Sequence, residues 1–211
     1  MGREFVEIFD EWVHTYDDSV NGKDKEYEDV FVNYNEILQA VADRAVSPVI
    51  EFGVGTGNLT QKMVDLGLRV VGIEPNQAMR AATAEKFPEL QIRDGDFLEF
   101  EQPDSVKSFT STYAFHHLTD AEKAQAFKLY ADKLPAGGKV VFADTVFESE
   151  RAKQQMIVFE ESRGYANLVE DLNREYYTTL PVMKELIEAA GFRVEFTQLN
   201  KYVWLIDATK R

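Results

Sequence analysis

Apolar and polar positions follow two different periods along this chain. Up to residue 46 the apolar positions recur every three or four residues, which predicts helices over 3–17 and about 25–45. Short apolar runs then alternate with amphipathic stretches, which predicts strands at 49–52, 69–73, 90–93, 109–115 and 138–143, with helices at 58–66, 76–86 and 119–133. This alternation is typical of a parallel sheet that helices cover on both faces.

The last third of the chain departs from this rhythm. We expect a mostly helical segment over 147–174 with a break near Gly164, and then a helix over 180–190 that Gly191 ends. Two strands, 192–198 and 202–208, form a closing hairpin that would add an antiparallel strand to the sheet. The prediction is one doubly wound, Rossmann-like α/β domain with an N-terminal helical cap (1–46), a core (47–211) and a helical insertion (about 147–178).

Composition narrows the classes of partner. The chain has no cysteine, which excludes disulfide frameworks, zinc–thiolate sites and cysteine nucleophiles. A formal net charge of −14 opposes binding to nucleic acid and to anionic membrane surfaces. No apolar run approaches the ~20 residues that a membrane span requires, and the first residues contain no apolar signal region. We therefore expect a cytoplasmic protein, monomeric or homodimeric, that acts on a small molecule.

The clearest chemical motif is the sequence Glu-Phe-Gly-Val-Gly-Thr-Gly-Asn at 51–58, directly after the first strand of the predicted core. Gly53, Gly55 and Gly57 allow a tight turn and a close approach of backbone N–H groups to a ligand. The following helix presents its positive end to the same place. The motif predicts a nucleotide-like ligand at the carboxyl edge of the sheet.

Three residues favour one ligand class over another. The dinucleotide fingerprint requires glycine where this chain has Asn58 or Thr60, and the Gly-Lys-Ser/Thr ending of the P-loop is absent. Glu51, at the mouth of the loop, would repel a pyrophosphate but suits a ligand that carries an ammonium and a sulfonium. The motif therefore favours S-adenosylmethionine over NAD.

Further carboxylates follow the next two predicted strands. Glu74 ends the second strand, where a carboxylate can accept hydrogen bonds from both ribose hydroxyls. Asp96 and Phe97 follow the third strand, where Asp96 could accept a hydrogen bond from an adenine amino group and the ring of Phe97 could lie against the adenine. The alternative is that the segment 94–96 is only a turn.

At these residues the chain resembles the class I S-adenosylmethionine-dependent methyltransferases, and in particular small uncharacterised methyltransferases of low-GC Gram-positive bacteria. The resemblance extends over nearly the whole chain and rests on the segments 51–60, 112–118, 134–145, 9–12 and 16–17. It implies a seven-stranded sheet with the last strand antiparallel. It also implies that Gly53, Glu74 and Asp96 contact the cofactor, and that the N-terminal segment with Trp12 and Tyr16 covers it.

Other residues are candidates for catalysis and for binding of the methyl acceptor. His116 and His117 lie at the carboxyl end of the fourth strand and are the candidates for a general base, the alternative being that they only pack or cap. Tyr16 is a candidate cofactor contact and Trp12 a candidate pocket residue, unless both simply belong to the core. Relatives build the acceptor pocket in the insertion, which makes candidates of Arg151, Arg163 and Tyr165. Three histidines without convergent acidic spacing do not indicate a metal site.

The sequence leaves two functions open. The first is methyl transfer from S-adenosylmethionine to a small-molecule acceptor, with S-adenosylhomocysteine as product. The alternative is a regulatory module that binds S-adenosylmethionine or S-adenosylhomocysteine without turnover. A nicotinamide-dependent oxidoreductase is disfavoured by Asn58.

Overall fold

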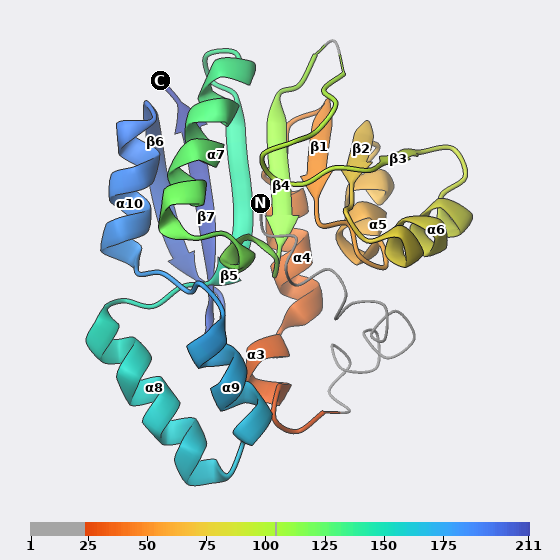
Figure 1. Ribbon diagram of the computed structural model, residues 1–211. Helices are drawn as coiled ribbons and strands as arrows, with labels where there is room; N and C mark the ends of the chain where they lie inside the picture. The colour runs from red at the N-terminus through yellow and green to blue at the C-terminus, as the bar shows by residue number, and fades with distance from the viewer. Residues whose placement is uncertain (1–23, 104) are drawn as a thin grey trace.

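Seven strands form one sheet in the order β3-β2-β1-β4-β5-β7-β6 in the computed structural model, which describes residues 24–103 and 105–211 (Figure 1). The strands are β1 (Val49–Phe52), β2 (Val70–Ile73), β3 (Gln91–Arg93), β4 (Ser108–Thr112), β5 (Lys139–Thr145), β6 (Phe192–Gln198) and β7 (Val203–Lys210). The first five strands are parallel to one another, whereas β7 lies between β5 and β6 and is antiparallel to both. The predicted Rossmann-like sheet, with its last strand antiparallel, is confirmed. The predicted helix over 3–17, with Trp12 and Tyr16, lies outside the described residues.

Helices cover both faces of the sheet because side chains alternate along each strand. In β1, Phe52 packs in one core cluster with α7 (Asp120–Lys133) and α10 (Leu180–Ala189). Val49 packs in the other cluster, with α4 (Tyr34–Ala42) and α5 (Asn58–Asp65). The helix α6 (Gln77–Lys86) connects β2 to β3. Figure 1 shows α7 and α10 on one side of the sheet and α4 on the other.

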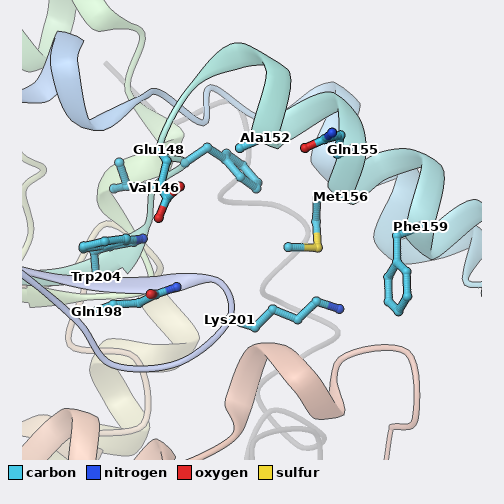
Figure 2. A pocket seen from close by; sticks show the side chains of 10 residues that line it. Val146, Glu148, Ala152, Gln155, Met156, Phe159, Gln198, Lys201 and Trp204 are labelled. Atoms are coloured by element: carbon cyan, nitrogen blue, oxygen red, sulfur yellow. The ribbon is translucent and has the colours of Figure 1, made fainter.

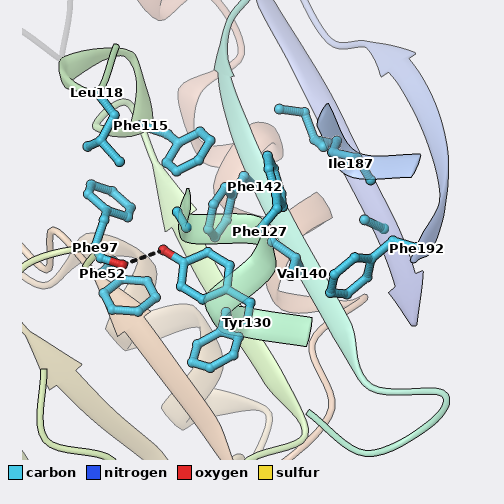
Figure 3. Packing of buried hydrophobic residues seen from close by; sticks show 14 of the residues in the cluster. Phe52, Phe97, Phe115, Leu118, Phe127, Tyr130, Val140, Phe142, Ile187 and Phe192 are labelled. Atoms are coloured by element: carbon cyan, nitrogen blue, oxygen red, sulfur yellow. Dashed lines mark hydrogen bonds between the residues drawn. The ribbon is translucent and has the colours of Figure 1, made fainter. Parts of the chain in front are cut away.

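An aromatic cluster fixes the two segments that carry the predicted ligand contacts. Tyr130 of α7 stacks on Phe52, at the end of β1, with 5.5 Å between ring centroids. The Tyr130 hydroxyl donates a 3.0 Å hydrogen bond to the carbonyl of Phe97, which follows β3 (Figure 3). Both partners are fully or nearly fully buried, so the glycine loop and the loop after β3 share one rigid support.

Two predicted elements are shorter in the structure than in the sequence pattern. The helix predicted over 25–45 is divided into α3 (Glu28–Phe31) and α4, because Asn33 adopts a left-handed conformation with φ 62°. The strand predicted over 109–115 ends at Thr112, because Tyr113 is also left-handed, with φ 53°. A short 3₁₀ helix, η2 (Phe115–His117), follows. Neither residue is a glycine, the residue that most often adopts this conformation, and neither break was predicted.

The insertion consists of two helices, α8 (Glu150–Arg163) and α9 (Ala166–Arg174), and Gly164 separates them with φ 77°. The chain leaves the sheet and returns at neighbouring points. Phe147 donates its N–H to the carbonyl of Thr178 and accepts from the N–H of Leu180, at 3.1 and 2.8 Å. Among the described helices, including these two, none combines the length and the apolar character that crossing a bilayer requires.

Candidate functional site

The glycine loop after β1 has a left-handed backbone at all three glycines. The φ angles of Gly53, Gly55 and Gly57 are 64°, 56° and 79°. A Cβ atom on Gly57 would lie 2.6 Å from Phe87, and one on Gly53 would lie 3.0 Å from the Cβ of Ala114. A Cβ on Gly55 would have no neighbour within 4 Å. Gly57 is therefore required by packing, whereas Gly55 faces open space.

Glu74 connects this loop to the ends of two other elements. One carboxylate oxygen accepts a 2.9 Å hydrogen bond from the Gly55 N–H, and the other accepts one of 2.9 Å from the N–H of Asn76, at the start of α6. The side chain is buried, and burial raises the pKa of Glu74 although the two backbone donors oppose the shift. A carboxylate has about four acceptor positions, so both oxygens retain capacity for a ligand.

Glu51 is fully buried beneath the same loop. Its carboxyl group accepts a 2.5 Å hydrogen bond from the hydroxyl of Thr60. Burial raises the pKa of Glu51 to about 8, so the group is largely protonated at neutral pH. Glu51, Gly53, Gly55 and Tyr34 are among the residues that line a small cavity of about 20 Å³. The sequence predicts a negative charge here, whereas the structure contains a carboxyl group that ionises readily only beside a cation.

Asp96 organises the loop after β3. One of its carboxylate oxygens accepts hydrogen bonds from the N–H groups of Leu98 and Glu99, both at 2.9 Å. The turn chemistry that the sequence analysis kept as an alternative is therefore present, and contact of Asp96 with an adenine stays a prediction.

Phe97 lies at the edge of the aromatic cluster. Its ring packs beside Phe52 and Phe115, with centroids 5.1 and 5.2 Å away. An apolar ring gains from burial of this kind. Contact of the Phe97 ring with an adenine stays a prediction.

His116 is held between two carboxylates. Its Nδ1 lies 2.6 Å from Asp144 at the end of β5, and its Nε2 lies 3.1 Å from Glu175 after α9. Its backbone N–H also donates to Asp144, at 2.9 Å. Burial alone would lower the pKa of His116, but Asp144 and then Glu175 outweigh burial and raise the pKa to about 10. The same imidazolium outweighs burial at Glu175 and lowers the pKa of that carboxyl to about 2.

This arrangement disfavours the expected general-base role of His116. At neutral pH the ring is protonated, and each ring nitrogen already faces a carboxylate. His117 differs, because burial and then the neighbouring charge of His116 lower the pKa of His117 to about 3. His117 is therefore a neutral but weakly basic imidazole, and a catalytic role for it stays a prediction.

The segment after α9 is fixed against this pair. The ring of Tyr177 stacks on His116 with 4.9 Å between centroids, and its hydroxyl donates to Glu175 at 2.7 Å. Lys123 of α7, only 1% exposed, donates to the carbonyls of Leu118 and Tyr176 at 2.5 and 2.6 Å. The insertion is thus anchored to the carboxyl end of β4.

The proposed arginines of the insertion are not gathered into one pocket. Arg163 contacts Asp29 of α3 and Glu160 at 2.6 and 3.0 Å, and donates to the hydroxyl of Tyr165 at 3.1 Å. Its guanidinium is thus engaged by the protein's own carboxylates, which argues against the expected contact with a substrate carboxylate. Arg151 is exposed in the first turn of α8.

A cavity of about 310 Å³ lies between α8 and the β6–β7 turn (Figure 2). Its apolar part includes Met156, Phe159 and Trp204, and its polar part includes Glu148 and Lys201. Arg151, Arg163 and Tyr165 do not line it. The sequence does not indicate this cavity, because its walls come from segments about fifty residues apart and no local pattern predicts that they meet.

Comparison with known proteins agrees with this geometry. Residues 49–138 match the methyltransferase domain family. An uncharacterized methyltransferase of Bacillus cytotoxicus is 49% identical over 212 residues, covering 100% of both chains. One of Exiguobacterium sibiricum is 51% identical over 210 residues, covering 100% of this chain and 99% of its own.

Solved structures share the fold at low identity. A possible histamine N-methyltransferase of Thermotoga maritima superposes with a TM-score of 0.68 at 17% identity, covering 98% of this chain and 99% of its own. Human N-acetylserotonin methyltransferase in complex with SAM gives 0.66 at 18% identity, covering 87% of this chain and 53% of its own. With full-length relatives at about half identity, the chain belongs to the S-adenosylmethionine-dependent methyltransferase family.

Proposed function

We propose that this chain binds S-adenosylmethionine at the carboxyl edge of β1–β3 and transfers its methyl group to a small-molecule acceptor. The observation that carries the proposal is the hydrogen bond between Glu74 and Gly55, because it places a buried carboxylate beside an open, left-handed glycine loop. Relatives and structural neighbours that are methyltransferases support the same assignment.

The residues of the loop fit such a ligand. Open space beside Gly55 leaves room over the backbone, and Glu74 retains acceptor capacity for ribose hydroxyls. Glu51 lines the small cavity and becomes a counter-charge when a cation enters, because a neighbouring positive charge lowers the pKa of a buried carboxyl. The cavity itself admits only a small group, so the adenosine would lie over the open side of the loop towards Asp96.

The chain's own contribution is to bind and to orient. Bound S-adenosylmethionine supplies a methyl group that its sulfonium already activates. The residues must then hold the acceptor in line with that group and exclude water. Because His116 is engaged by Asp144 and Glu175, we infer transfer without a general base at His116. The cavity beside α8 supports an acceptor that enters from the insertion.

A regulatory module without turnover is the second candidate, and the engaged state of His116 is the observation that favours it. The two functions make the same prediction for binding and opposite predictions for turnover. We further propose a cytoplasmic location, and we expect no nucleic-acid partner because the net charge is −14.

The test has two stages. Thermal unfolding with S-adenosylmethionine, S-adenosylhomocysteine or NAD should show stabilisation by the first two only, about 2.7 kcal/mol when ligand is present at 100 times its dissociation constant. Incubation with methyl-labelled S-adenosylmethionine and a fractionated pool of small metabolites should then yield a labelled product. Binding without label would favour the regulatory module, and stabilisation by NAD alone would overturn both candidates.

A further inference from the structure

Two imidazoles and one carboxylate converge at the carboxyl end of β4. His116, His117 and Glu175 each offer one ligand atom, and these atoms lie within 4.8 Å of one another. No other group of this kind is found in residues 24–103 and 105–211. His116 and His117 belong to η2, whereas Glu175 follows α9, so the insertion completes a cluster that the sequence alone does not indicate.

The spacing within the cluster is close to that of ligands on one metal ion. His116 Nε2 lies 3.1 Å from one oxygen of Glu175, and His117 Nε2 lies 3.9 Å from the other. Two ligand atoms on a tetrahedral zinc ion, each about 2.1 Å from the metal, lie about 3.4 Å apart. Small rotations of these side chains would therefore bring the three ligands onto one centre, and the entering ion would displace to solvent the proton that His116 Nε2 holds towards Glu175 in the metal-free chain.

The surroundings of His116 match those of a metal-bound histidine. The Nδ1 of His116 lies 2.6 Å from the carboxylate of Asp144, which leaves Nε2 directed at Glu175. A histidine that binds a metal through one ring nitrogen usually donates the other N–H to a carboxylate, which fixes its tautomer and orientation. Asp144 is itself held, because it accepts backbone N–H groups from His116 and Thr145 at 2.9 and 2.7 Å.

Glu175 is likewise pre-positioned. The Tyr177 hydroxyl donates to it at 2.7 Å, and the backbone N–H of Tyr176 donates to the His116 carbonyl at 3.1 Å. Arg174 stands 3.8 Å from the oxygen that faces His117, with a side chain 41% exposed. These contacts hold the carboxylate at the two imidazoles through the backbone as well as through side chains.

We propose that His116, His117 and Glu175 bind one divalent transition-metal ion, with Asp144 orienting His116. Two histidines and one carboxylate form a recurring donor set of catalytic zinc and iron(II) sites, and imidazole selects such ions over magnesium and calcium. Three protein ligands leave at least one coordination position open. The site would therefore take a small molecule with a thiol, amine or hydroxyl donor as an additional ligand.

The proposal is tested by metal binding alone, without S-adenosylmethionine. The full chain is stripped with a chelator, dialysed, and titrated separately with Co²⁺, Zn²⁺ and Mg²⁺. We expect one equivalent of Co²⁺ or Zn²⁺, visible absorption bands from bound Co²⁺, and no comparable binding of Mg²⁺. Absence of both bound metal and Co²⁺ bands would overturn the proposal.

Variants locate the ion. Glu175→Gln and His117→Gln should abolish the Co²⁺ bands, whereas Asp144→Asn should weaken affinity about 10- to 100-fold, as loss of such an orienting partner does elsewhere. Glu185→Gln, an exposed acid in α10, is the matched control and should bind like the unmodified chain. Thermal unfolding identifies which variants fold cooperatively, and any one folded ligand variant that retains the bands refutes the assignment.

These experiments test the metal site independently of the proposed binding of S-adenosylmethionine. Metal binding is read without methyl donor, and binding of S-adenosylhomocysteine can be measured on metal-free protein. If the metal fails to bind, the assignment of the glycine loop is unaffected. If S-adenosylhomocysteine fails to bind, the metal site still stands on its own titration.

Discussion

The carboxylate of Glu74 and the backbone N–H of Gly55 are joined by a 2.9 Å hydrogen bond that crosses from the end of β2 to the loop after β1. The second carboxylate oxygen accepts a hydrogen bond from the N–H of Asn76. One buried side chain therefore binds both the loop after β1 and the residue at the start of α6. These two hydrogen bonds connect the carboxyl ends of β1 and β2 to the start of α6.

Glu74→Gln should lower the affinity for S-adenosylhomocysteine about 10- to 100-fold. The amide cannot present two acceptor oxygens to the N–H groups of Gly55 and Asn76, and hydrogen bonds to a charged group contribute about 1.5–3 kcal/mol. Isothermal titration calorimetry measures the effect, with the exposed Glu85→Gln in α6 as control. Equal affinities of the two variants would show that the cofactor does not bind at Glu74.

Gly55→Ala and Gly67→Ala form a matched pair. Both glycines are left-handed and both have open space where a Cβ would be, so each substitution should cost about 1–2 kcal/mol of stability from backbone strain alone. Only Gly55→Ala should also weaken binding of S-adenosylhomocysteine, because its methyl group occupies the space over the loop. Denaturant unfolding and calorimetry separate the two effects. Equal loss of binding in both variants would contradict this placement.

Glu51→Gln should change how stability depends on pH. The pKa of Glu51 is about 8 in the folded chain against 4.5 for an ordinary glutamate, so the folded state retains a proton that the unfolded state releases. The stability linked to this proton is full below pH 4.5 and is lost as pH rises through about 8. As pH rises from 4.5 to about 8, the free energy of unfolding of Glu51→Gln should therefore increase relative to that of the unmodified chain. A constant difference across the range would argue against a buried, protonated Glu51.

Arg163→Gln should lower the melting temperature without changing affinity for S-adenosylhomocysteine. Glu160 is 0% exposed, and Arg163, Lys201 and the hydroxyl of Tyr202 all contact its carboxylate. Losing one positive partner leaves a buried charge less compensated. Thermal unfolding compares this variant with Arg151→Gln, which alters an exposed arginine on the same helix. A larger effect from Arg151→Gln would mean that the Arg163 contacts contribute little.

Most helices and strands were predictable because caps and apolar periods depend on residues that are close together in the sequence. Gly67 ends α5 in a left-handed conformation, and Thr119 with Glu122 forms the predicted capping box of α7. The alternation of strands and helices was sufficient for the sheet, because crossover connections of this kind have one favoured hand. The breaks at Asn33 and Tyr113 were not predicted, since a left-handed conformation is uncommon in residues other than glycine.

The candidate site was predictable only in part, for a related reason. Glu51, Gly55 and Glu74 lie at the ends of successive strands, so topology alone brings them together. Glu175 reaches His116 through the path of α8 and α9, and no pattern in the sequence records a contact between residues so far apart. The packing of the Phe97 ring against Phe52 and Phe115 was not predicted, because it depends on aromatic rings that other elements supply.

The parallel bridge between Phe147 and Thr179 has a consequence for how such a protein can diversify. The chain leaves β5 and returns before α10 at backbone positions that are hydrogen-bonded to each other. The insertion between these positions is therefore a loop whose two ends meet beside the sheet. Its length and sequence can change without altering the register of any strand, since loop closure depends only weakly on length. A different insertion can then be accommodated while the glycine loop and the strands that carry it keep their structure.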